Sequence, residues 1–181
     1  MRVITGTARG RRLKELPGLD TRPTTDKVKE SIFNIIQFDI EGRNVLDLFG
    51  GSGQLSAEAL SRGAARATVV DLNPAAVKVI KENMGLCGFS DRARVLGSDA
   101  RAFLAGSREK FDLVFLDPPY ASTLLEEALE TIAAIDIVSE NGIIVCESAL
   151  DKALPELPQP YEKGREYRYG KIKVTVYHRK A

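Results

Sequence analysis

The chain has few of the residues that build metal centres and disulfide frameworks. Its 181 residues include two cysteines, Cys87 and Cys146, which are far apart in the sequence, and a single histidine, His178. Zinc sites and disulfide frameworks use closely spaced groups of these residue types. We therefore expect no metal site, and we interpret the two cysteines as buried thiols of a reducing compartment.

Long apolar runs are also missing. The longest, such as Gly142–Cys146, are far shorter than the roughly 20 residues that cross a bilayer. The first residues, Met1–Gly6, lack the pattern of a secretory signal, so we expect a cytoplasmic protein that does not contact membranes. Repeats and low-complexity segments are absent, and 44% hydrophobic with 28% charged residues is typical of a single globular domain.

The chain also lacks a net charge of either sign. The total is +1, which by itself argues against a nucleic-acid partner. The charge is nevertheless unevenly distributed: residues 1–14 hold five basic residues and no acid, and residues 163–181 hold seven against Glu166 alone. If the two ends meet on one face, they form a positive surface that can bind phosphates. The alternative is that basic ends only keep the chain in solution.

From residue 44 onward, short apolar runs alternate with helical patterns. Such strand–helix–strand units predict a parallel sheet covered by helices on both faces. We expect strands at Asn44–Phe49, Ala67–Asp71, Ala93–Leu96, Leu113–Asp117 and Gly142–Glu147, and helices at Gln54–Arg62, Pro74–Gly85, Ala100–Ala105 and Leu124–Ile135.

The two ends of the chain follow other patterns. Alternating side chains at Glu166–Tyr169 and Ile172–Tyr177 predict an antiparallel hairpin at the sheet edge. Met1–Lys14 suggests a small β-hairpin that turns near Arg9, and Asp26–Phe38 has helical spacing, with Thr25 or Asp26 as its cap. We expect residues 1–43 to form an N-terminal extension packed on a main domain of residues 44–181.

A buried strand ending at Asp47 runs into the glycine-rich turn Gly50-Gly51-Ser52-Gly53, which opens a helix. Glycines allow a ligand to approach the backbone, and the helix start offers unbonded amides. Asp71, at the end of the next strand, is placed to accept hydrogen bonds from the hydroxyls of a ribose. Although many glycine-rich turns are only tight connections, this combination favours nucleoside binding.

Two departures from the dinucleotide fingerprint narrow the choice of nucleoside. Ser56 stands where the third glycine belongs, and Asp47 puts a negative charge where it would repel a pyrophosphate. A cationic group would be favoured there, which indicates S-adenosylmethionine. Asp99, after the third strand, is a candidate acceptor for the adenine amino group, a simple helix cap, or both.

The tetrapeptide Asp117-Pro118-Pro119-Tyr120 follows the fourth strand, at the edge where open α/β sheets place their chemistry. The Asp117 carboxylate and the Pro118 carbonyl together can hold both hydrogens of a planar exocyclic amine and aim its lone pair at an electrophilic methyl. Tyr120 offers a face on which the target base can stack. A plain proline turn is the alternative.

With these motifs the chain resembles the class I S-adenosylmethionine-dependent methyltransferases. More narrowly, it resembles the RsmD-type family, which methylates the exocyclic N2 amine of a guanine in 16S ribosomal RNA (the guanine(966)-N(2) type). The closer match rests on Arg2–Gly6, Gly10–Leu13, Arg22–Asn34, Asp47–Gly53, Asp117–Tyr120 and Tyr169-Gly170. Gly51 is a minor departure, because superfamily relatives often have another small residue there.

The resemblance implies an α/β, Rossmann-like class I methyltransferase fold, with a seven-stranded mostly parallel sheet, an antiparallel C-terminal hairpin and a small N-terminal hairpin and helix extension. It implies that Arg22 and Thr24 line the lip of the active site, although a plain turn before a helix is an alternative. The expected catalytic residues are Asp117, Pro118, Pro119 and Tyr120; the cofactor residues are Asp47, Phe49, Gly50, Gly51, Gly53, Asp71, Leu72, Asp99 and Ala100; and the RNA-binding residues are Arg2, Arg9, Arg11, Arg12, Lys14, Arg22, Thr24, Arg165, Arg168 and Lys171.

The expected partner is 16S rRNA, alone or in a 30S subunit that is assembled or assembling, and we expect the enzyme to act as a monomer. Three alternatives stay open. An adenine-N6 methyltransferase of DNA or RNA uses a similar tetrapeptide, but 181 residues leave no room for a large target-recognition domain. A non-catalytic RNA-binding assembly protein is disfavoured by the intact motifs, and a nicotinamide-dependent dehydrogenase is disfavoured by Asp47 and Ser56.

Overall fold

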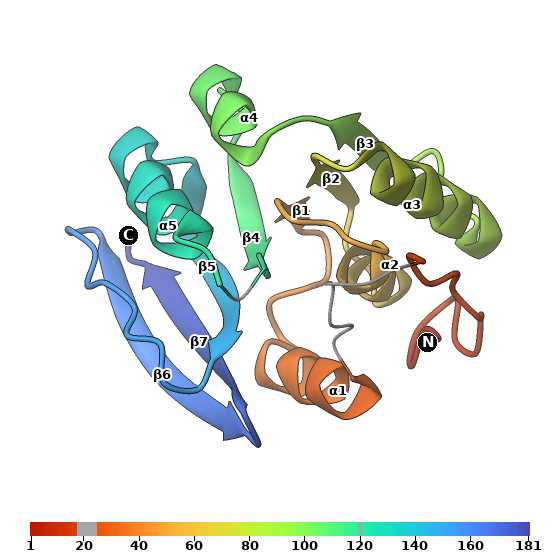
Figure 1. Ribbon diagram of the computed structural model, residues 1–181, viewed down its shortest axis with the longest axis horizontal. Coiled ribbons are helices and arrows are strands. Elements are labelled where there is room, and N and C mark those ends of the chain that lie inside the picture. The colour runs from red at the N-terminus through yellow and green to blue at the C-terminus, as the bar shows by residue number, and fades with distance from the viewer. Residues whose placement is uncertain (18–24, 120) are drawn as a thin grey trace.

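A seven-stranded sheet forms the centre of the molecule (Figure 1). The computed structural model describes residues 1–17, 25–119 and 121–181. The strand order is β3-β2-β1-β4-β5-β7-β6; the first five strands are parallel, β7 is antiparallel to β5, and β6 is antiparallel to β7. The mostly parallel sheet and the C-terminal hairpin are thus confirmed. The strands are β1 Asn44–Asp47, β2 Arg66–Asp71, β3 Ala93–Gly97, β4 Phe111–Leu116, β5 Val138–Ala149, β6 Tyr161–Tyr169 and β7 Ile172–Arg179.

Five helices are found in the described part of the chain, and their starts agree with the sequence. Thr25 accepts a hydrogen bond from the Val28 amide, Asn73 caps the third helix, and Asp99 caps the fourth. In the described ranges, every helix is too short or too polar to span a membrane. The helices are α1 Asp26–Ile35, α2 Gln54–Ser61, α3 Pro74–Cys87, α4 Ala100–Gly106 and α5 Leu124–Ile135.

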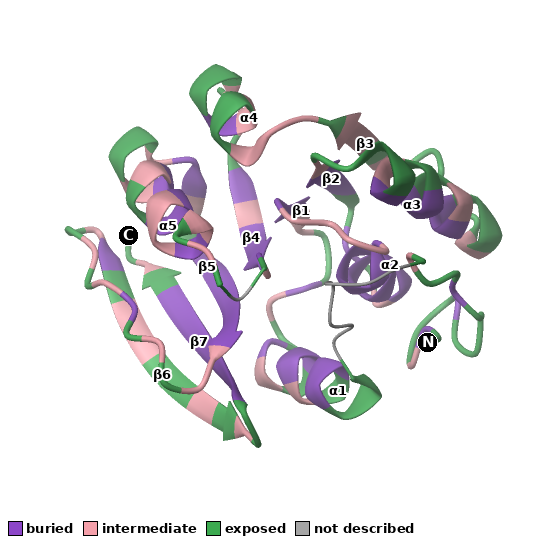
Figure 2. Ribbon diagram, viewed as in Figure 1, coloured by how far each residue is buried: buried purple, intermediate pink, exposed green. Residues whose placement is uncertain are grey.

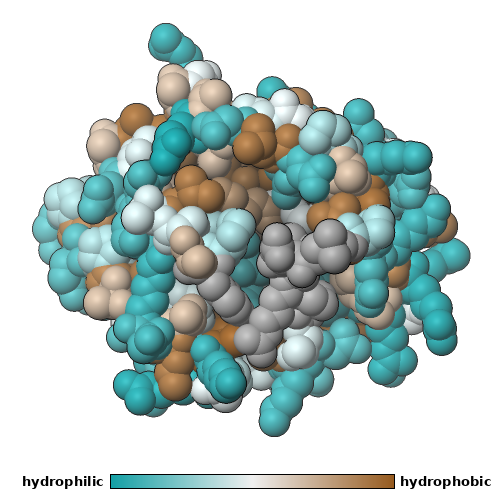
Figure 3. Space-filling model, in the orientation of Figure 1, coloured by the Kyte–Doolittle hydropathy of each residue, from teal (hydrophilic) through white to brown (hydrophobic). Residues whose placement is uncertain are grey.

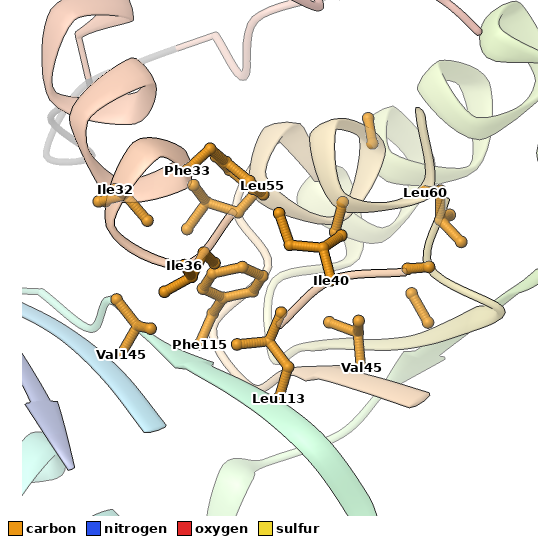
Figure 4. Close-up of a cluster of buried hydrophobic side chains, with 14 of the residues drawn as sticks. Ile32, Phe33, Ile36, Ile40, Val45, Leu55, Leu60, Leu113, Phe115 and Val145 are labelled. Atoms are coloured by element: carbon orange, nitrogen blue, oxygen red, sulfur yellow. The ribbon is translucent and has the colours of Figure 1, made fainter. Parts of the chain in front are cut away.

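Each face of the sheet is covered by its own hydrophobic cluster, because successive residues of a strand point to opposite faces. Figure 4 shows part of the cluster beneath α1 and α2, in which Phe33 of α1 packs on Phe115 of β4 with ring centroids 5.8 Å apart. On the other face, Val114 and Leu116 of the same strand pack beneath α4 and α5. We call these the α1–α3 face and the α4–α5 face.

The N-terminal segment, residues 1–14, lies on the α1–α3 face and shares its hydrophobic cluster through Val3, Ala8 and Leu13. The expected β-hairpin is reduced to a single antiparallel bridge, between Arg2 and Arg12. Cross-hairpin backbone bonds flank the bridge: the Val3 amide donates to the Arg11 carbonyl, the Gly10 amide to the Val3 carbonyl and the Leu13 amide to the Met1 carbonyl. No regular strands form, because the amides of Ile4, Thr5, Ala8 and Lys14 bond to side chains of α2 and α3 instead.

The helix expected at Asp26–Phe38 ends at Ile35. Ile36 leaves the helical conformation, and the Asp39 amide then closes a turn on the Ile36 carbonyl. Phe38 therefore falls outside the apolar face of α1 and is 91% exposed.

The register brings distant segments to one edge of the sheet. β1, β2 and β4 are parallel neighbours, so the residues that follow their carboxyl ends lie together. Ala149, the last residue of β5, pairs with Ile172, the first residue of β7. The β6–β7 turn therefore lies at the same edge, which we call the carboxyl edge.

Candidate active site

The glycine loop, residues 50–53, is held against β2 and α3. The Gly50 amide donates to the Val70 carbonyl at 2.8 Å, and a Cβ on Gly50 would lie 2.6 Å from a methyl of Val69. Gly51 and Gly53 have φ values of 61° and 81°, a region that favours glycine. The loop thus needs glycine both for close packing and for its backbone turns.

Asp71 ties the end of β2 to this loop. One carboxylate oxygen accepts from the Gly51 amide and the other from the Asn73 amide, each at 2.9 Å. The side chain is half-buried and therefore open to a ligand on its outer side. Because a carboxylate oxygen has two lone pairs, Asp71 keeps acceptor capacity for hydroxyl groups while it holds the loop.

Asp47, the last residue of β1, is a buried carboxylate with half of its acceptor capacity unused. It is 1% exposed, and the Ser56 hydroxyl donates to Oδ2 at 2.8 Å. Oδ1 has no hydrogen-bond partner among the described residues. Burial raises the pKa of Asp47 to about 7, and the Asp71 charge acts in the same direction, against the Ser56 bond. A cationic donor beside Oδ1 would satisfy this group, so the site suits the amino end of S-adenosylmethionine.

Other predicted cofactor residues surround the same loop. Asp99 caps α4 through Oδ1, which accepts from the Arg101 and Ala102 amides. Phe49 and Ala100 pack against the cluster of the α4–α5 face, whereas Leu72 is 69% exposed beside Asp71. Figure 3 shows a hollow with apolar walls on this side of the molecule, over the end of β1. An aromatic ring bound there would cover exposed apolar surface.

The predicted catalytic tetrapeptide begins directly after β4 at the same edge. Asp117 is half-buried, Pro118 is buried and Pro119 is exposed. The Ser122 hydroxyl donates to the Pro119 carbonyl at 2.8 Å, which closes the turn towards α5. Tyr120 lies outside the described residues. The structure thus brings Asp117 and the glycine loop to the ends of two neighbouring strands, β4 and β1.

The basic residues of the N-terminal segment spread from the glycine loop, which Met1 contacts, to the far end of α2, where Ala8 bonds to Ser61. Arg2 and Arg12 are paired across the bridge and line a surface cleft of about 520 Å³ together with Met1, Gly10 and Asp26. The Ser52 hydroxyl of the glycine loop lies 3.3 Å from the Met1 sulfur. Lys14 lies against α3, where it forms a 2.9 Å ion pair with Glu82. Arg9 and Arg11 are exposed, and Arg22 and Thr24 lie outside the described residues.

The basic C-terminal residues divide into two sets. Arg165, Arg168 and Lys171 are exposed, and Arg165 stacks on the Tyr167 ring at 5.7 Å. Arg168 pairs with Lys173 and Tyr167 with Val174, so Arg168 and Tyr167 point to opposite faces of the hairpin. Three further cations are ion-paired and contribute less to a positive surface: Lys173 with Glu166, Arg179 with Asp136 and Lys180 with Glu162.

In Figure 1 the N-terminal segment lies at the right and the β6–β7 hairpin at the left, with α1 between them. The N-terminal segment packs on α2 and α3, and Tyr167 and Tyr169 of β6 pack at the other end of the same cluster. The positive residues thus form two separate groups, with α1 between them.

Sequence reasoning missed a group of buried polar residues beneath the N-terminal segment. Glu58 of α2 is fully buried and accepts from the Ile4 amide at 2.8 Å and the Thr5 amide at 3.0 Å. The Arg62 Nε donates to Glu58 at 2.9 Å, and the Lys29 Nζ lies 3.6 Å from it. Burial lowers the pKa of Lys29, although the charge of Glu58 opposes this shift. Helical spacing alone gives no signal for such a group, since its partners come from a distant segment.

No group of three or more metal-ligating side chains occurs within residues 1–17, 25–119 and 121–181.

Comparisons with known proteins agree with this geometry. The family model described as "Conserved hypothetical protein 95" matches residues 1–178. The chain is 42% identical to the Bacillus subtilis protein YlbH over 98% of both chains, and 37% identical to the "Ribosomal RNA small subunit methyltransferase D" of Escherichia coli K12 over 100% of this chain and 91% of that protein. The solved structure of Escherichia coli yhhF superposes with a TM-score of 0.90 at 35% identity and covers 100% of this chain and 98% of that one.

Solved structures at lower identity show the same fold. An RNA methyltransferase from Salinibacter ruber, in complex with S-adenosyl-L-homocysteine, has a TM-score of 0.69 at 16% identity. Together with the full-length match of the family model, the matched relatives and the Rossmann-like sheet show that the chain belongs to the conserved hypothetical protein 95 family, the RsmD-type methyltransferases.

Proposed function

We propose that the protein transfers a methyl group from S-adenosylmethionine to the exocyclic N2 amine of a guanine in 16S ribosomal RNA. The observation that carries the proposal is the meeting, at one sheet edge, of a glycine loop with a buried, half-satisfied carboxylate and the Asp117-Pro118-Pro119 turn. The 37% identity to a ribosomal RNA small subunit methyltransferase D over the whole chain supports the choice of an RNA substrate.

In this proposal each carboxylate of the cofactor site binds a different part of S-adenosylmethionine. Asp47 receives the cationic amino end, because its buried Oδ1 lacks a partner among the described residues. Asp71 accepts from the ribose hydroxyls, and Asp99 accepts from the adenine amino group while it caps α4. The remaining cofactor residues supply backbone and apolar contacts: Phe49, Gly50, Gly51, Gly53, Leu72 and Ala100.

The bound cofactor supplies an electrophilic methyl on a positively charged sulfur. Asp117 and the Pro118 carbonyl accept the two hydrogens of the guanine amine and turn its lone pair towards that methyl, which is catalysis by positioning. Pro119 keeps the turn stiff, and Tyr120 stacks on the base once the guanine has left its own stack. The nitrogen becomes acidic as it gains the methyl and releases a proton to Asp117 or water, so no strong base is required.

The RNA binds around the edge by its phosphates. In this proposal residues 1–43 form the RNA-binding extension and residues 44–181 the methyltransferase domain, which acts as a monomer in the cytoplasm. The phosphate-binding residues are Arg2, Arg9, Arg11, Arg12, Lys14, Arg22, Thr24, Arg165, Arg168 and Lys171.

The test is incubation of the full chain with labelled S-adenosylmethionine and 16S rRNA, both as naked RNA and in 30S particles, followed by nucleoside analysis. We expect N2-methylguanosine with at least one of the two substrates. N6-methyladenosine would identify an adenine-N6 methyltransferase instead. Cofactor binding without transfer to any RNA would indicate a non-catalytic RNA-binding protein, and tight NADH binding would indicate a dehydrogenase.

A further inference from the structure

Asn83 of α3 joins the N-terminal segment to the glycine loop. Its side chain is fully buried. Oδ1 accepts from the Lys14 amide at 2.7 Å, and Nδ2 donates to the Lys14 carbonyl at 3.0 Å and to the Ser52 carbonyl at 2.8 Å. One side chain thus bonds both backbone groups of Lys14 and the loop residue that stands between Gly51 and Gly53.

The same segment is also fixed to the helix that the glycine loop opens. Ser61, at the end of α2, donates to the Thr5 carbonyl at 2.6 Å and accepts from the Ala8 amide at 2.9 Å. The Ser61 carbonyl leaves no room for a side chain at Gly6, whose added Cβ would lie 1.9 Å from it. Glu58 binds the Ile4 and Thr5 amides one turn earlier in α2.

These contacts explain why α2 is buried along its whole length, as Figure 2 shows, although it contains Glu58 and two serines. The N-terminal segment bonds to Glu58 and Ser61, and Ser56 bonds to Asp47 of β1. The polar groups at this interface are bonded to each other in the described structure, so a shift of the segment would leave buried groups unsatisfied. The N-terminal segment and the glycine loop are therefore expected to change conformation together.

We propose that Asn83 is a positioning residue that couples RNA binding on the N-terminal segment to cofactor binding on the glycine loop. The inference rests on the proposed function and adds a prediction to it: each ligand strengthens the binding of the other. RNA phosphates bound to Arg9, Arg11 and Arg12 hold the N-terminal segment in place. The bonds between Lys14 and Asn83 are therefore kept. Asn83 in turn holds the Ser52 carbonyl in the arrangement that receives the cofactor. Binding linkage requires the effect to be reciprocal.

The test measures the affinity of S-adenosylhomocysteine, which cannot react, with and without the RNA form that accepts methyl groups in the labelling experiment. Couplings between sites commonly change an affinity about 5- to 150-fold. We expect the wild-type protein to bind S-adenosylhomocysteine at least about fivefold more tightly with RNA present. In Asn83→Ala we expect the ratio of the affinity with RNA to the affinity without RNA to fall to about one.

Two further variants separate coupling from folding and from charge. Asn83→Ser leaves room for water to satisfy the exposed backbone groups and keeps the test usable if Asn83→Ala does not fold; its ratio should also fall to about one. Lys14→Ala removes the ion pair with Glu82 but keeps the backbone groups that Asn83 binds, so it should weaken RNA binding and retain the ratio.

A purely structural role for Asn83 would weaken S-adenosylhomocysteine binding equally with and without RNA, and the unchanged ratio would overturn the proposal. A ratio of about one in Lys14→Ala would also overturn the proposal, because the charge of Lys14 would then be what couples the binding of the two ligands. A wild-type protein that methylates RNA but shows a ratio of one refutes the coupling and leaves the proposed function intact. A wild-type protein that neither binds S-adenosylhomocysteine nor transfers methyl groups refutes both.

Discussion

The two faces of the sheet bury different kinds of side chain. Beneath α4 and α5 the cluster is built mainly from aliphatic and aromatic residues, with Leu129 and Ile132 of α5 fully buried on the strands. The α1–α3 face buries a comparable cluster together with Asp47, Glu58 and Asn83, each 0–1% exposed. Figure 2 shows buried helix surface on both sides of the sheet, although α2 is buried along its whole length and α4 is mostly exposed. The buried polar groups are what distinguishes the α1–α3 face chemically.

A buried polar group costs free energy unless it is bonded, so its retention needs a reason. On the α1–α3 face the reasons are specific. At the end of β1, beside the glycine loop, Asp47 keeps an acceptor that has no partner among the described residues. Glu58 holds the N-terminal segment on α2, and Asn83 joins that segment to the glycine loop. The α4–α5 face has no comparable group on its helices within the described residues, and it serves as scaffold. Residues on the α4–α5 face thus stabilise the fold, whereas the buried polar residues of the α1–α3 face prepare the site.

The largest expected effect is the loss of methyl transfer in Asp117→Ala. Removal of one preorganised group from a transition state commonly costs about 10²–10³-fold in rate, and we expect about 10³-fold here. The affinity for S-adenosylhomocysteine should change less than about threefold, since Asp117 holds the target amine. Single-turnover rates and calorimetric binding measure the two quantities.

The matched variant is Ile144→Val, on the α4–α5 face of the neighbouring strand β5. It should lose about 1 kcal/mol of stability and keep the wild-type rate. Rapid methyl transfer by Asp117→Ala would remove Asp117 from the mechanism.

The next largest effect is on stability. Leu129→Ala opens a cavity in the apolar cluster of the α4–α5 face, where Leu129 is 0% exposed. We expect a loss of about 3 kcal/mol in the free energy of unfolding. Denaturant unfolding at an unchanged m-value measures it, and the rate per folded molecule should stay near wild type. A selective loss of cofactor binding in this variant would mean that the α4–α5 face is more than scaffold.

A smaller effect is expected on the pH dependence of stability, through the Asp47 carboxyl group. Its folded-state pKa of about 7 lies above the ordinary value of 3.8, so between about pH 4 and 7 the folded protein binds more protons than the unfolded chain. The stability of the ligand-free protein should therefore fall as the pH rises through this window. Asp47→Asn should remove this fall and raise Tm by a few degrees at pH 8.

Cofactor affinity should show the opposite trend, because a cationic amino group favours the ionised carboxylate. Affinity for S-adenosylhomocysteine should rise as the pH rises towards 7 in the wild-type protein and lose this rise in Asp47→Asn, with a weakening of about tenfold at pH 8. Asp91→Asn, at an exposed position, is the control and should change neither profile. A pH-independent affinity in the wild-type protein would contradict the pairing of Asp47 with the amino group.

The smallest expected effect is on RNA affinity. Arg9→Gln removes one exposed charge from the N-terminal segment, whereas Arg108→Gln removes an exposed charge after α4. We expect Arg9→Gln to weaken RNA binding a few-fold and to reduce the salt dependence by about one phosphate contact, and Arg108→Gln to do neither. Filter binding over a salt series measures both, and equal effects of the two variants would argue against a defined RNA-binding side.

Much of the scaffold could be predicted from the sequence because it depends on local patterns. Alternating runs gave the parallel strands, and Asn73-Pro74 and Asp99 marked helix starts that the structure confirms. The hairpin at residues 161–179 followed from side-chain alternation, although both strands are longer than the pattern indicated. Asp47 could also be singled out from the sequence, because a negative charge before the glycine loop does not suit the pyrophosphate of a dinucleotide.

The contacts of the N-terminal segment could not be predicted in this way. The small hairpin expected in residues 1–14 is present as a bridge with cross-hairpin bonds. The amides of Ile4, Thr5 and Ala8 bond to α2, many positions away in the sequence, which no local pattern indicated. The same limit applies to charge: counting gave a basic C-terminal end, whereas Lys173 is buried and paired with Glu166. Long-range pairing decides these cases, and one sequence contains no signal for it.

The most direct measurement is the structure of the protein with S-adenosylhomocysteine bound. The account predicts that the ligand lies at the carboxyl edge, with its amino group on Asp47, its ribose on Asp71 and its base beside Asp99 and Leu72. Binding on the α4–α5 face, or binding that leaves the Asp47 carboxylate without a new partner, would contradict the account.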